Sequence, residues 1–427
     1  MRHVILGNGP AGVVAAEAIR KTDPEVEITL IGDELEPPYA RMALPYLLQE
    51  DIQEDGTYLR KDASHFDRLR INLITAHAEN VDTKAQQVRI DTGALLPYDR
   101  LLIATGARPT KPPISGIDAA CVQTCWTLED ARKITPLAKP RSRVVQIGAG
   151  FIGCIILQAL VNRGVRLTVV EAGDRMVPRM MTPVAGGLIR KWCQKKGVQV
   201  HTERRVRSIT PDMKRAGSVF VELDSGDELP ADLVICAAGV QPNIEFLAGS
   251  GIATEKGVLV DERLGTNVPG VYAAGDVAEA FDFSTGERAI NAIQPDAVEQ
   301  GRIAGLNMAG KETFCVGSLS FNVLDTLGLI SSSFGKWWGV IDGDSAELVD
   351  EQNYRYLSLQ FKGDVLIGAT SVGHTANVGV LRGLIQTKKH LGEWKDHLLR
   401  DPTLIMQASL AGAVAFGATP PGEAYNR

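Results

Sequence analysis

Two short glycine-rich motifs constrain this chain more than any other feature of its sequence. The first, Gly7–Gly12, reads GNGPAG and follows the apolar run Val4–Leu6. The second, Gly148–Gly153, reads GAGFIG and follows Val144–Ile147. A G-x-G-x-x-G loop between a strand and a helix lets the backbone approach a pyrophosphate, whose charge the helix N-terminus stabilises. The two motifs together predict two dinucleotide sites in an α/β protein.

Each glycine of the first motif has its own expected task. Gly7 permits the sharp turn after the strand, and Gly9 allows the backbone close to the pyrophosphate. Gly12 lets the following helix pack closely on the strand. We expect that helix from about Pro10 to Arg20, with Ala11 in its first turn.

An acidic residue after the second strand of such a unit holds ribose hydroxyls. The run Glu27–Ile31 is the expected second strand, and Asp33 and Glu34 follow it. The spacing does not choose between these two carboxylates, so both are candidates.

The second motif repeats this logic with one acidic candidate. A helix is expected over Phe151–Asn162 and a strand over Arg166–Val170, which ends on Glu171. A carboxylate there accepts hydrogen bonds from the adenosine ribose and repels a 2′-phosphate, so NAD is favoured over NADP. Arg175 is close enough in sequence to weaken that preference.

Length and charge exclude several other classes of protein. With 427 residues the chain is expected to form two or three domains. The formal net charge of −6 gives no basic field for nucleic acid. No apolar run is long enough to span a membrane, and the chain opens directly on a strand, so a cytoplasmic protein without a membrane link is expected.

Three further motifs extend the pattern beyond the two glycine loops. They are Leu101–Pro109 (LLIATGARP), Leu233–Asn243 (LVICAAGVQPN) and Gly270–Asp276 (GVYAAGD). In this order and spacing, residues 1–310 resemble the flavoproteins with two dinucleotide-binding domains. These are the pyridine nucleotide-disulfide reductases, and the resemblance is to the branch that contains rubredoxin, ferredoxin and nitrite reductases.

The resemblance implies an α/β fold with two Rossmann-like domains, each a three-layer domain around a parallel sheet, and a C-terminal α+β interface domain. The FAD domain would be split into residues 1–108 and 232–310. The NAD domain would be inserted as residues 109–231, and the interface domain would span 311–427. FAD would bind the first glycine motif and NAD the second.

The resemblance also implies roles for individual residues. Asp276 would accept a hydrogen bond from the FAD ribityl chain, and Val81 would touch the adenine. A helix from Gln294 would direct its N-terminus at the flavin, although the family usually has Trp at that position. The expected FAD-binding residues are Gly7, Gly9, Pro10, Ala11, Gly12, Asp33, Glu34, Arg41, Val81, Thr105, Gly106, Asp276 and Ala297. The expected NAD-binding residues are Gly148, Gly150, Phe151, Ile152, Gly153, Glu171 and Gly239.

The expected redox position of the family holds no cysteine in this chain. Met42 stands where thiol-dependent relatives carry a single cysteine, and no cysteine precedes Cys121. A thioether cannot act as a thiolate nucleophile or cycle through a disulfide. Near the flavin, Tyr46 and Ile155 replace a Lys and a Glu that the family often carries. Besides the flavin itself, Arg41, Tyr46 and Ile155 are therefore the candidates beside the reaction, and no metal site is expected.

These features predict an FAD-dependent NAD(H) oxidoreductase that exchanges a hydride between NAD(H) and FAD. Single electrons would pass between FAD and an iron–sulfur protein or subunit of the rubredoxin or ferredoxin type. The chain would act as a homodimer or within a hetero-oligomeric complex, and the flavin subunit of a tungsten aldehyde oxidoreductase is one suspected form. The alternatives are an NADH oxidase, a reductase of thiols, peroxide or coenzyme A disulfide, and a redox-sensing NADH-binding interaction protein.

The C-terminal part carries no glycine motif. Strands are expected over Tyr354–Phe361 and Asp364–Thr370, and a helix over Gly379–Lys389. The Ala-, Gly- and Pro-rich tail Ala408–Arg427 is expected to be an extended arm, either docked on a neighbouring subunit or frayed.

Overall fold

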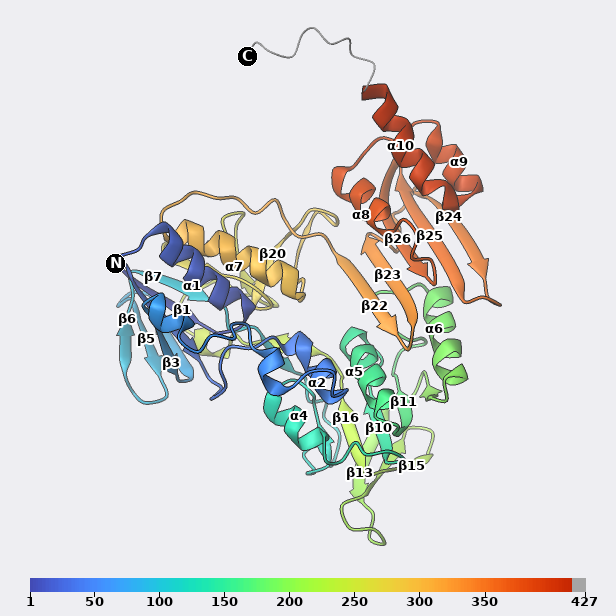
Figure 1. Cartoon of the computed structure of the whole chain (residues 1–427), viewed down its shortest axis with the longest axis horizontal. Helices are drawn as coiled ribbons and strands as arrows, with labels where there is room; N and C mark the ends of the chain where they lie inside the picture. Colours follow the sequence, from blue (N-terminus) through green and yellow to red (C-terminus); the bar gives the residue numbers. More distant parts are fainter. Residues whose placement is uncertain (417–427) are drawn as a thin grey trace. The chain divides into compact units, whose positions relative to one another are not determined.

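The computed structural model describes residues 1–416 of the chain. They form two compact units (Figure 1). Residues 1–147, 159–166 and 206–318 make the first unit, and residues 148–158, 167–205 and 319–416 make the second. These boundaries differ from the expected division into three domains, which stays a prediction. Helices and strands occur in both units, so the α/β fold class is confirmed.

A parallel five-stranded sheet forms the core of the first unit. Its order is β19-β7-β1-β2-β3. The strands span β1 Arg2–Leu6, β2 Glu27–Gly32, β3 Ile71–Thr75, β7 Arg100–Ile103 and β19 Val271–Ala273. Nearly every residue of β1, β2 and β7 is buried, as expected for strands covered on both faces. Because β19 pairs with β7, segments far apart in sequence complete one sheet.

Two long helices of the first unit pack against each other (Figure 1). They are α1 (Pro10–Thr22) and α7 (Gln294–Met308). The contact depends on glycines of α7, because a Cβ at Gly301 would lie 2.2 Å from the Ala11 carbonyl oxygen. A Cβ at Gly305 would lie 2.6 Å from the Ala15 carbonyl oxygen. Helix α7, which is far from α1 in the sequence, is thereby held against the first glycine motif.

Several smaller elements complete the first unit. Two antiparallel three-stranded sheets contain β4 Ala78–Asp82, β5 Gln87–Ile90 and β6 Leu95–Pro97, and β13 Val206–Pro211, β14 Val219–Leu223 and β15 Glu228–Ala231. A third three-stranded sheet is mixed: β18 Val258–Leu259 pairs in parallel with β20 Ala278–Asp282, which pairs antiparallel with β21 Glu287–Ala289. Strand β8 (Ala107–Pro109) pairs with β17 (Val240–Pro242), and β16 (Leu233–Cys236) pairs in parallel with β10 (Arg143–Ile147) and β9 (Val122–Gln123). The short helical segments are η1 Arg41–Ala43, α2 Leu44–Leu48, η2 Glu54–Thr57, α3 His65–Arg68, α4 Leu128–Ile134 and η3 Glu245–Leu247.

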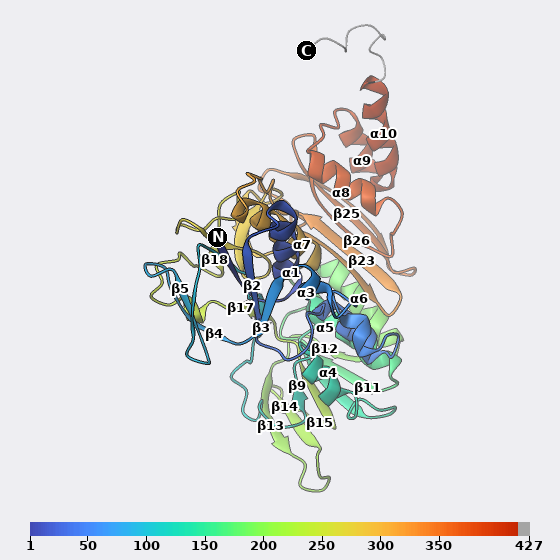
Figure 2. The same ribbon diagram turned by 60° about the vertical axis from the view of Figure 1, so that its left-hand side comes forward.

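The second unit contains the second glycine motif and the C-terminal sheet. Strand β11 (Arg166–Val170) pairs in parallel with β12 (Gln199–His201), and helices α5 (Phe151–Asn162) and α6 (Pro183–Lys195) belong to the same region of the chain. The antiparallel sheet has the order β22-β23-β26-β25-β24. Its strands are β22 Phe321–Thr326, β23 Leu329–Gly335, β24 Asp344–Asp350, β25 Arg355–Lys362 and β26 Val365–Val372. Helices α8 (Val378–Thr387), α9 (Trp394–Arg400) and α10 (Ile405–Phe416) lie beside it, as Figure 2 shows. The short segment η4 (Pro402–Leu404) contacts β24 and β25.

The C-terminal elements agree with the sequence except at the tail. The expected strands and helix are observed as β25, β26 and α8. Helix α10, however, includes the first part of the tail that was expected to be extended. Its sequence IMQASLAGAVAF contains four alanines, the residue that favours helix most, and lacks proline. Residues 417–427 lie outside the described part. None of the helices within residues 1–416 is long and apolar enough to cross a membrane.

Candidate functional site

Two glycines of the first motif are required by the fold itself. Gly7 has a φ of +107°, and a Cβ there would lie 2.0 Å from the Ala104 carbonyl oxygen. Its N–H donates to the Ile31 carbonyl at 2.7 Å and joins the loop to β2. A Cβ at Gly12 would lie 1.9 Å from the Gly7 carbonyl oxygen. Both positions therefore exclude a side chain for reasons of backbone packing.

Gly9 differs from these two glycines, because a Cβ there would meet nothing within 4 Å. It is the N-cap of α1, and no side chain caps the helix. The N–H groups of Ala11 and Gly12 in the first helical turn lack acceptors within the helix. The motif also lies where the sheet order reverses between β1 and β7, at the carboxyl ends of the strands. These features fit a pyrophosphate at Gly9, Pro10 and Ala11.

The two carboxylates that follow β2 have different surroundings. Glu34 accepts hydrogen bonds from Arg41 Nη2 and from the Tyr39 hydroxyl, both at 2.6 Å. Asp33 is 62% exposed, with His77 Nδ1 at 3.6 Å. Glu34 is therefore engaged by protein groups, and Asp33 is the carboxylate at the end of β2 that remains accessible to a ribose.

Arg41 lies in a defined cluster. Its Nη1 donates to the Trp126 carbonyl at 2.8 Å and to the Tyr39 hydroxyl at 3.0 Å. Its guanidinium lies 5.5 Å from the ring centroids of both Tyr39 and Trp126. The Tyr39 hydroxyl also accepts the N–H of Leu128, which follows the capping residue of α4. These contacts fix the side chain, so Arg41 is not a freely moving surface cation.

The turn after β7 is held by Asn243. The Thr105 hydroxyl donates to the Asn243 carbonyl, and Asn243 Nδ2 donates to the Thr105 carbonyl, each at 2.9 Å. The Asn243 N–H donates to the Gly106 carbonyl at 3.0 Å. Both carbonyls of the turn are therefore used, and its N–H groups are the ones left for the expected backbone contacts with FAD.

Asp276 is the residue whose surroundings give the clearest indication of a ligand at the first site. Protein atoms surround it on nearly all sides, although part of the residue is accessible, and within residues 1–416 its carboxylate has no hydrogen bond or ion pair. Burial raises its pKa to about 6; the charge of Arg41 opposes this change and that of Asp296 adds to it. The preceding Gly275 N–H donates to the buried Gln300 Oε1 at 2.9 Å, which fixes the loop. An accessible, unpaired carboxylate fits a hydroxyl donor such as a ribityl chain.

The other residues expected at the first site have clear positions. Ala297, in the first turn of α7, is buried, and its Cβ lies 3.5 Å from the position of a Cβ on Gly275. Val81 is buried in β4. Gly239, expected at the NAD site, has a φ of +117°, and its carbonyl accepts the Thr110 N–H at 2.8 Å. The contacts of these residues with a dinucleotide stay predictions.

The second glycine motif has the same local geometry as the first. The Gly148 N–H donates to the Val170 carbonyl at 2.8 Å, and Gly148 has a φ of +99°. A Cβ at Gly150 would meet nothing within 4 Å. Phe151 and Ile152 begin α5, and Gly153 is buried behind them. This loop therefore also offers open space at its middle glycine for a pyrophosphate.

Glu171 is held by the backbone of the second site. One carboxylate oxygen accepts the Ala149 N–H and the other accepts the Gly173 N–H, both at 2.7 Å. Each oxygen keeps a further lone pair for a ribose hydroxyl. Arg175 is tied to Asp174 at 2.7 Å and to the Met181 carbonyl at 2.9 Å. Arg175 is thus not free to receive a 2′-phosphate, which supports the preference for NAD.

The thiols of the protein are poorly suited to redox chemistry. All six cysteines lie in the described part and are free. Burial raises the pKa of Cys125 and of Cys193 to about 12, and it also raises the pKa of each of the others. Met42, where a family cysteine was expected, is 45% exposed. Tyr46 is 55% exposed and Ile155 is partly buried. A reactive thiolate is therefore not observed near Met42.

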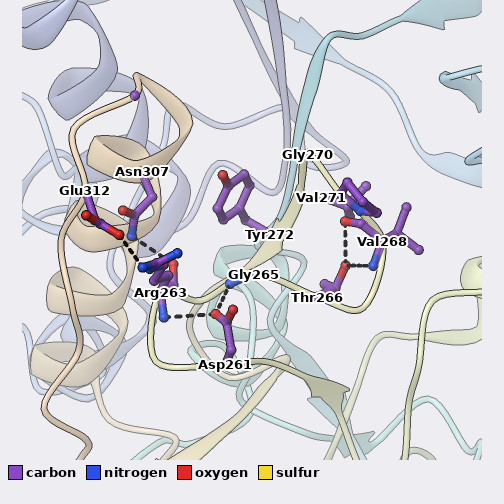
Figure 3. Close-up of a pocket in the computed structure, with 12 residues that line it drawn as sticks. Asp261, Arg263, Gly265, Thr266, Val268, Gly270, Val271, Tyr272, Asn307 and Glu312 are labelled. Atoms are coloured by element: carbon purple, nitrogen blue, oxygen red, sulfur yellow. Dashed lines mark hydrogen bonds and ion pairs between the residues drawn. The ribbon is translucent and has the colours of Figure 1, made fainter.

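A surface pocket of about 320 Å³ lies elsewhere on the first unit (Figure 3). Its polar groups mainly bind one another. Asp261 Oδ1 accepts the Gly265 N–H at 2.7 Å, Arg263 pairs with Glu312, and Asn307 Nδ2 donates to the Arg263 carbonyl at 2.9 Å. The pocket includes Gly270, at the amino end of β19, whereas the glycine motif follows the carboxyl end of β1. It is therefore separate from the dinucleotide site.

Three contributors to the first site were not predicted from sequence. Trp126 supplies a ring and a carbonyl to Arg41, Asn243 holds the turn after β7, and Gln300 holds the loop before Asp276. In the sequence, only Gln300 carries a signal for its role, because it is a polar residue on the helix face formed by Ala297, Ile303 and Ala304.

Comparisons with known proteins agree with this geometry. The family model described as pyridine nucleotide-disulphide oxidoreductase matches residues 1–301. The NADH-dependent phenylglyoxylate dehydrogenase subunit epsilon of Aromatoleum evansii is 31% identical over 412 residues, which cover 95% of this chain and 96% of that protein. The ferredoxin–NAD(+) reductase component of the anthranilate 1,2-dioxygenase system of Burkholderia cepacia is 32% identical over 314 residues, 72% of this chain and 76% of that one. The solved structure of an NAD-dependent persulfide reductase from A. fulgidus has a TM-score of 0.85 and 30% identity, and covers 98% of this chain and 84% of that chain.

Proposed function

Because this chain belongs to the pyridine nucleotide-disulphide oxidoreductase family, we propose that it links NAD(H), through FAD, to an iron–sulfur protein or subunit. Family membership makes it an oxidoreductase with FAD and NAD(H) as cofactors. Bound FAD supplies the chemistry that joins two-electron exchange with NAD(H) to one-electron exchange with a protein partner. The chain's own residues bind and orient the two dinucleotides and exclude competing reactions.

We assign FAD to the first glycine motif and NAD to the second. The first motif has a partly accessible, unpaired carboxylate nearby in Asp276, suited to hydroxyls along an extended ribityl chain. The second has Glu171 anchored on the loop itself and Arg175 held away, which suits an unphosphorylated adenosine ribose. Gly9 and Gly150 provide the two open positions for pyrophosphate.

The observation that carries this proposal is the state of the thiols. A thiol-dependent reductase needs an accessible cysteine with a lowered pKa. Here the residue at the expected position is Met42, and the pKa of every cysteine is raised by burial. Electrons on the flavin then need an outlet other than a disulfide, and a one-electron protein partner supplies it.

The named relatives support the kind of partner. One is by name a ferredoxin–NAD(+) reductase component, and another, similar over nearly the full length of both chains, is by name a subunit of an NADH-dependent dehydrogenase. We therefore propose that this protein is the NAD-linked flavin subunit of a larger assembly that contains iron–sulfur centres. The similarity to a persulfide reductase makes a sulfur substrate the alternative to test.

The test compares acceptors in the presence of NADH under anaerobic conditions. We expect turnover with a ferredoxin or rubredoxin, and much slower turnover with coenzyme A disulfide or a persulfide. Cys315→Ala and Cys121→Ala, which change the thiols least enclosed by the fold, should leave the ferredoxin rate within about twofold. Faster turnover with a sulfur substrate than with either iron–sulfur protein, lost in a cysteine variant that retains FAD, would overturn the proposal.

A further inference from the structure

The loop after β12 lies beside the residue that we assign to the adenosine ribose of the second site. Strand β12 pairs in parallel with β11, and its last residue, His201, is opposite Val170, the last residue of β11. Because the carboxyl ends of parallel strands meet at the same edge of a sheet, Glu171 and the loop 202–205 begin side by side. All of these residues belong to the second unit.

Two backbone hydrogen bonds hold this loop against Glu171. The Glu203 N–H donates to the Gly173 carbonyl at 2.8 Å, and the Arg204 N–H donates to the Glu171 carbonyl at 3.1 Å. The Gly173 N–H in turn donates to the Glu171 carboxylate at 2.7 Å. The segment 171–173, which fixes the carboxylate, is therefore bound directly to the segment that carries Arg204.

The guanidinium of Arg204 is held near this contact by a backbone carbonyl and not by a carboxylate. Its Nη1 donates to the Glu203 carbonyl at 2.8 Å. Glu203 thus binds Gly173 through its N–H and Arg204 through its carbonyl, with a φ of +56° that few residues other than glycine adopt. Arg204 is exposed, and within the described part of the chain it forms no ion pair. Arg175, by contrast, is paired with Asp174 at 2.7 Å. Arg204 is therefore a cation beside the ribose-binding segment that remains open to a ligand.

We propose that the Arg204 guanidinium stacks on the adenine of the dinucleotide bound at the second glycine motif and thereby contributes to the affinity for its adenosine half. A ribose held by Glu171 carries its base beside the adjoining loop, where Arg204 lies. A planar guanidinium stacks on the face of a base, and it is more weakly hydrated than an ammonium group. The inference rests on the proposed function in placing NAD(H) at this motif. It adds a recognition residue for the half of NAD(H) that takes no part in hydride transfer.

The experiment compares NADH with reduced nicotinamide mononucleotide, which lacks the adenosine half, as electron donors to ferricyanide in the FAD-loaded protein. We expect Arg204→Ala to raise the KM for NADH about fivefold, which is about 1 kcal/mol, with kcat unchanged. The KM for reduced nicotinamide mononucleotide should stay within about twofold of the parent. Arg207→Ala is the matched control, because Arg207 is 64% exposed and lies 3.5 Å from Glu222. It removes the same charge three residues along the chain and should leave both KM values within about twofold.

A second variant separates stacking from simple attraction of charge. Arg204→Lys keeps the charge but loses the planar group, so it should raise the KM for NADH nearly as much as Arg204→Ala does. A parent-like KM in Arg204→Lys, or equal increases for the two donors in Arg204→Ala, would overturn the inference. A larger loss of kcat/KM with NADPH than with NADH would assign Arg204 to a 2′-phosphate and would also overturn it. Ferricyanide replaces the protein partner in this assay, so the absence of any iron–sulfur acceptor would count against the proposed function and leave this inference standing.

Discussion

Replacing Gly9 by alanine separates the requirements of the fold from those of the dinucleotide. Gly9 has a φ of −73° and a ψ of −174°, which alanine adopts without strain, and its Cβ would meet no atom within 4 Å. Reduced entropy of the unfolded chain favours alanine by about 0.4–1 kcal/mol. The poorer N-cap of α1 offsets this by about 0.5–1 kcal/mol. The free energy of unfolding of the apoprotein should therefore change by less than about 0.5 kcal/mol.

The same methyl group would occupy the space that we assign to the pyrophosphate of FAD. We expect the Kd for FAD to rise at least about a hundredfold, a loss of about 2.7 kcal/mol of binding free energy. Gly12→Ala is the contrasting variant, because its Cβ would lie 1.9 Å from a backbone oxygen. It should destabilise the apoprotein itself by about 3 kcal/mol or more.

The assays are urea unfolding of the apoprotein and fluorescence titration with FAD. The reasoning is refuted if Gly9→Ala binds FAD as tightly as the parent while remaining folded. It is also refuted if Gly9→Ala destabilises the apoprotein as much as Gly12→Ala does.

Three further predictions concern stability, coenzyme choice and thiols. His3 is 1% exposed, and burial lowers its pKa from 6.5 to about 4, so it stays neutral in the fold. The free energy of unfolding should therefore be unaffected by His3 above pH 6.5 and should fall by about 3 kcal/mol in total as the pH decreases to about 4. His3→Leu should flatten the pH dependence of urea unfolding over this range, and an unchanged slope would contradict the assignment. In steady-state kinetics, Glu171→Gln should raise the KM for NADH about tenfold without improving kcat/KM for NADPH, because Arg175 remains bound to Asp174 and to the Met181 carbonyl. A higher kcat/KM for NADPH in this variant would show that Glu171 alone excludes the 2′-phosphate. Iodoacetamide at pH 7.5 should leave NADH:ferredoxin turnover of the native holoenzyme within about twofold, because the cysteine thiols remain protonated; rapid inactivation that FAD content does not explain would argue for a functional thiol.

Much of the fold was predictable because its signals are local. Gly7, with its positive φ, and Gly12, which packs against the Gly7 carbonyl, are required by the backbone of one strand–loop–helix unit, so the motif and its structure correspond directly. The buried apolar runs of β1, β2 and β7 likewise predict strands covered on both faces.

The details of the site depended on contacts between distant segments. Sequence spacing could not choose between Asp33 and Glu34, because the difference arises from Arg41 and Tyr39 folding back onto Glu34. The pairing of Gln300 with Gly275, which fixes the loop before Asp276, joins residues on different elements. Such contacts leave no periodic pattern in the sequence.

The one incorrect expectation about secondary structure concerned the start of the tail. The alanine-, glycine- and proline-rich composition of Ala408–Arg427 predicts an extended arm, but Ile405–Phe416 forms α10. The four alanines favour helix strongly enough to outweigh one glycine, and the prolines of the tail come only at positions 420 and 421. The position of the prolines, more than the overall composition of the tail, therefore determines where the helix is possible.

The most direct test of the central claim is an anaerobic titration of the FAD-loaded protein with NADH. If FAD is the chain's only redox centre and its thiols take no part, full reduction consumes about one NADH per FAD. An endpoint near two NADH per FAD, with a matching loss of two free thiols on reoxidation, would reveal a disulfide in the redox cycle. That result would contradict the proposal that electrons leave the flavin for another protein.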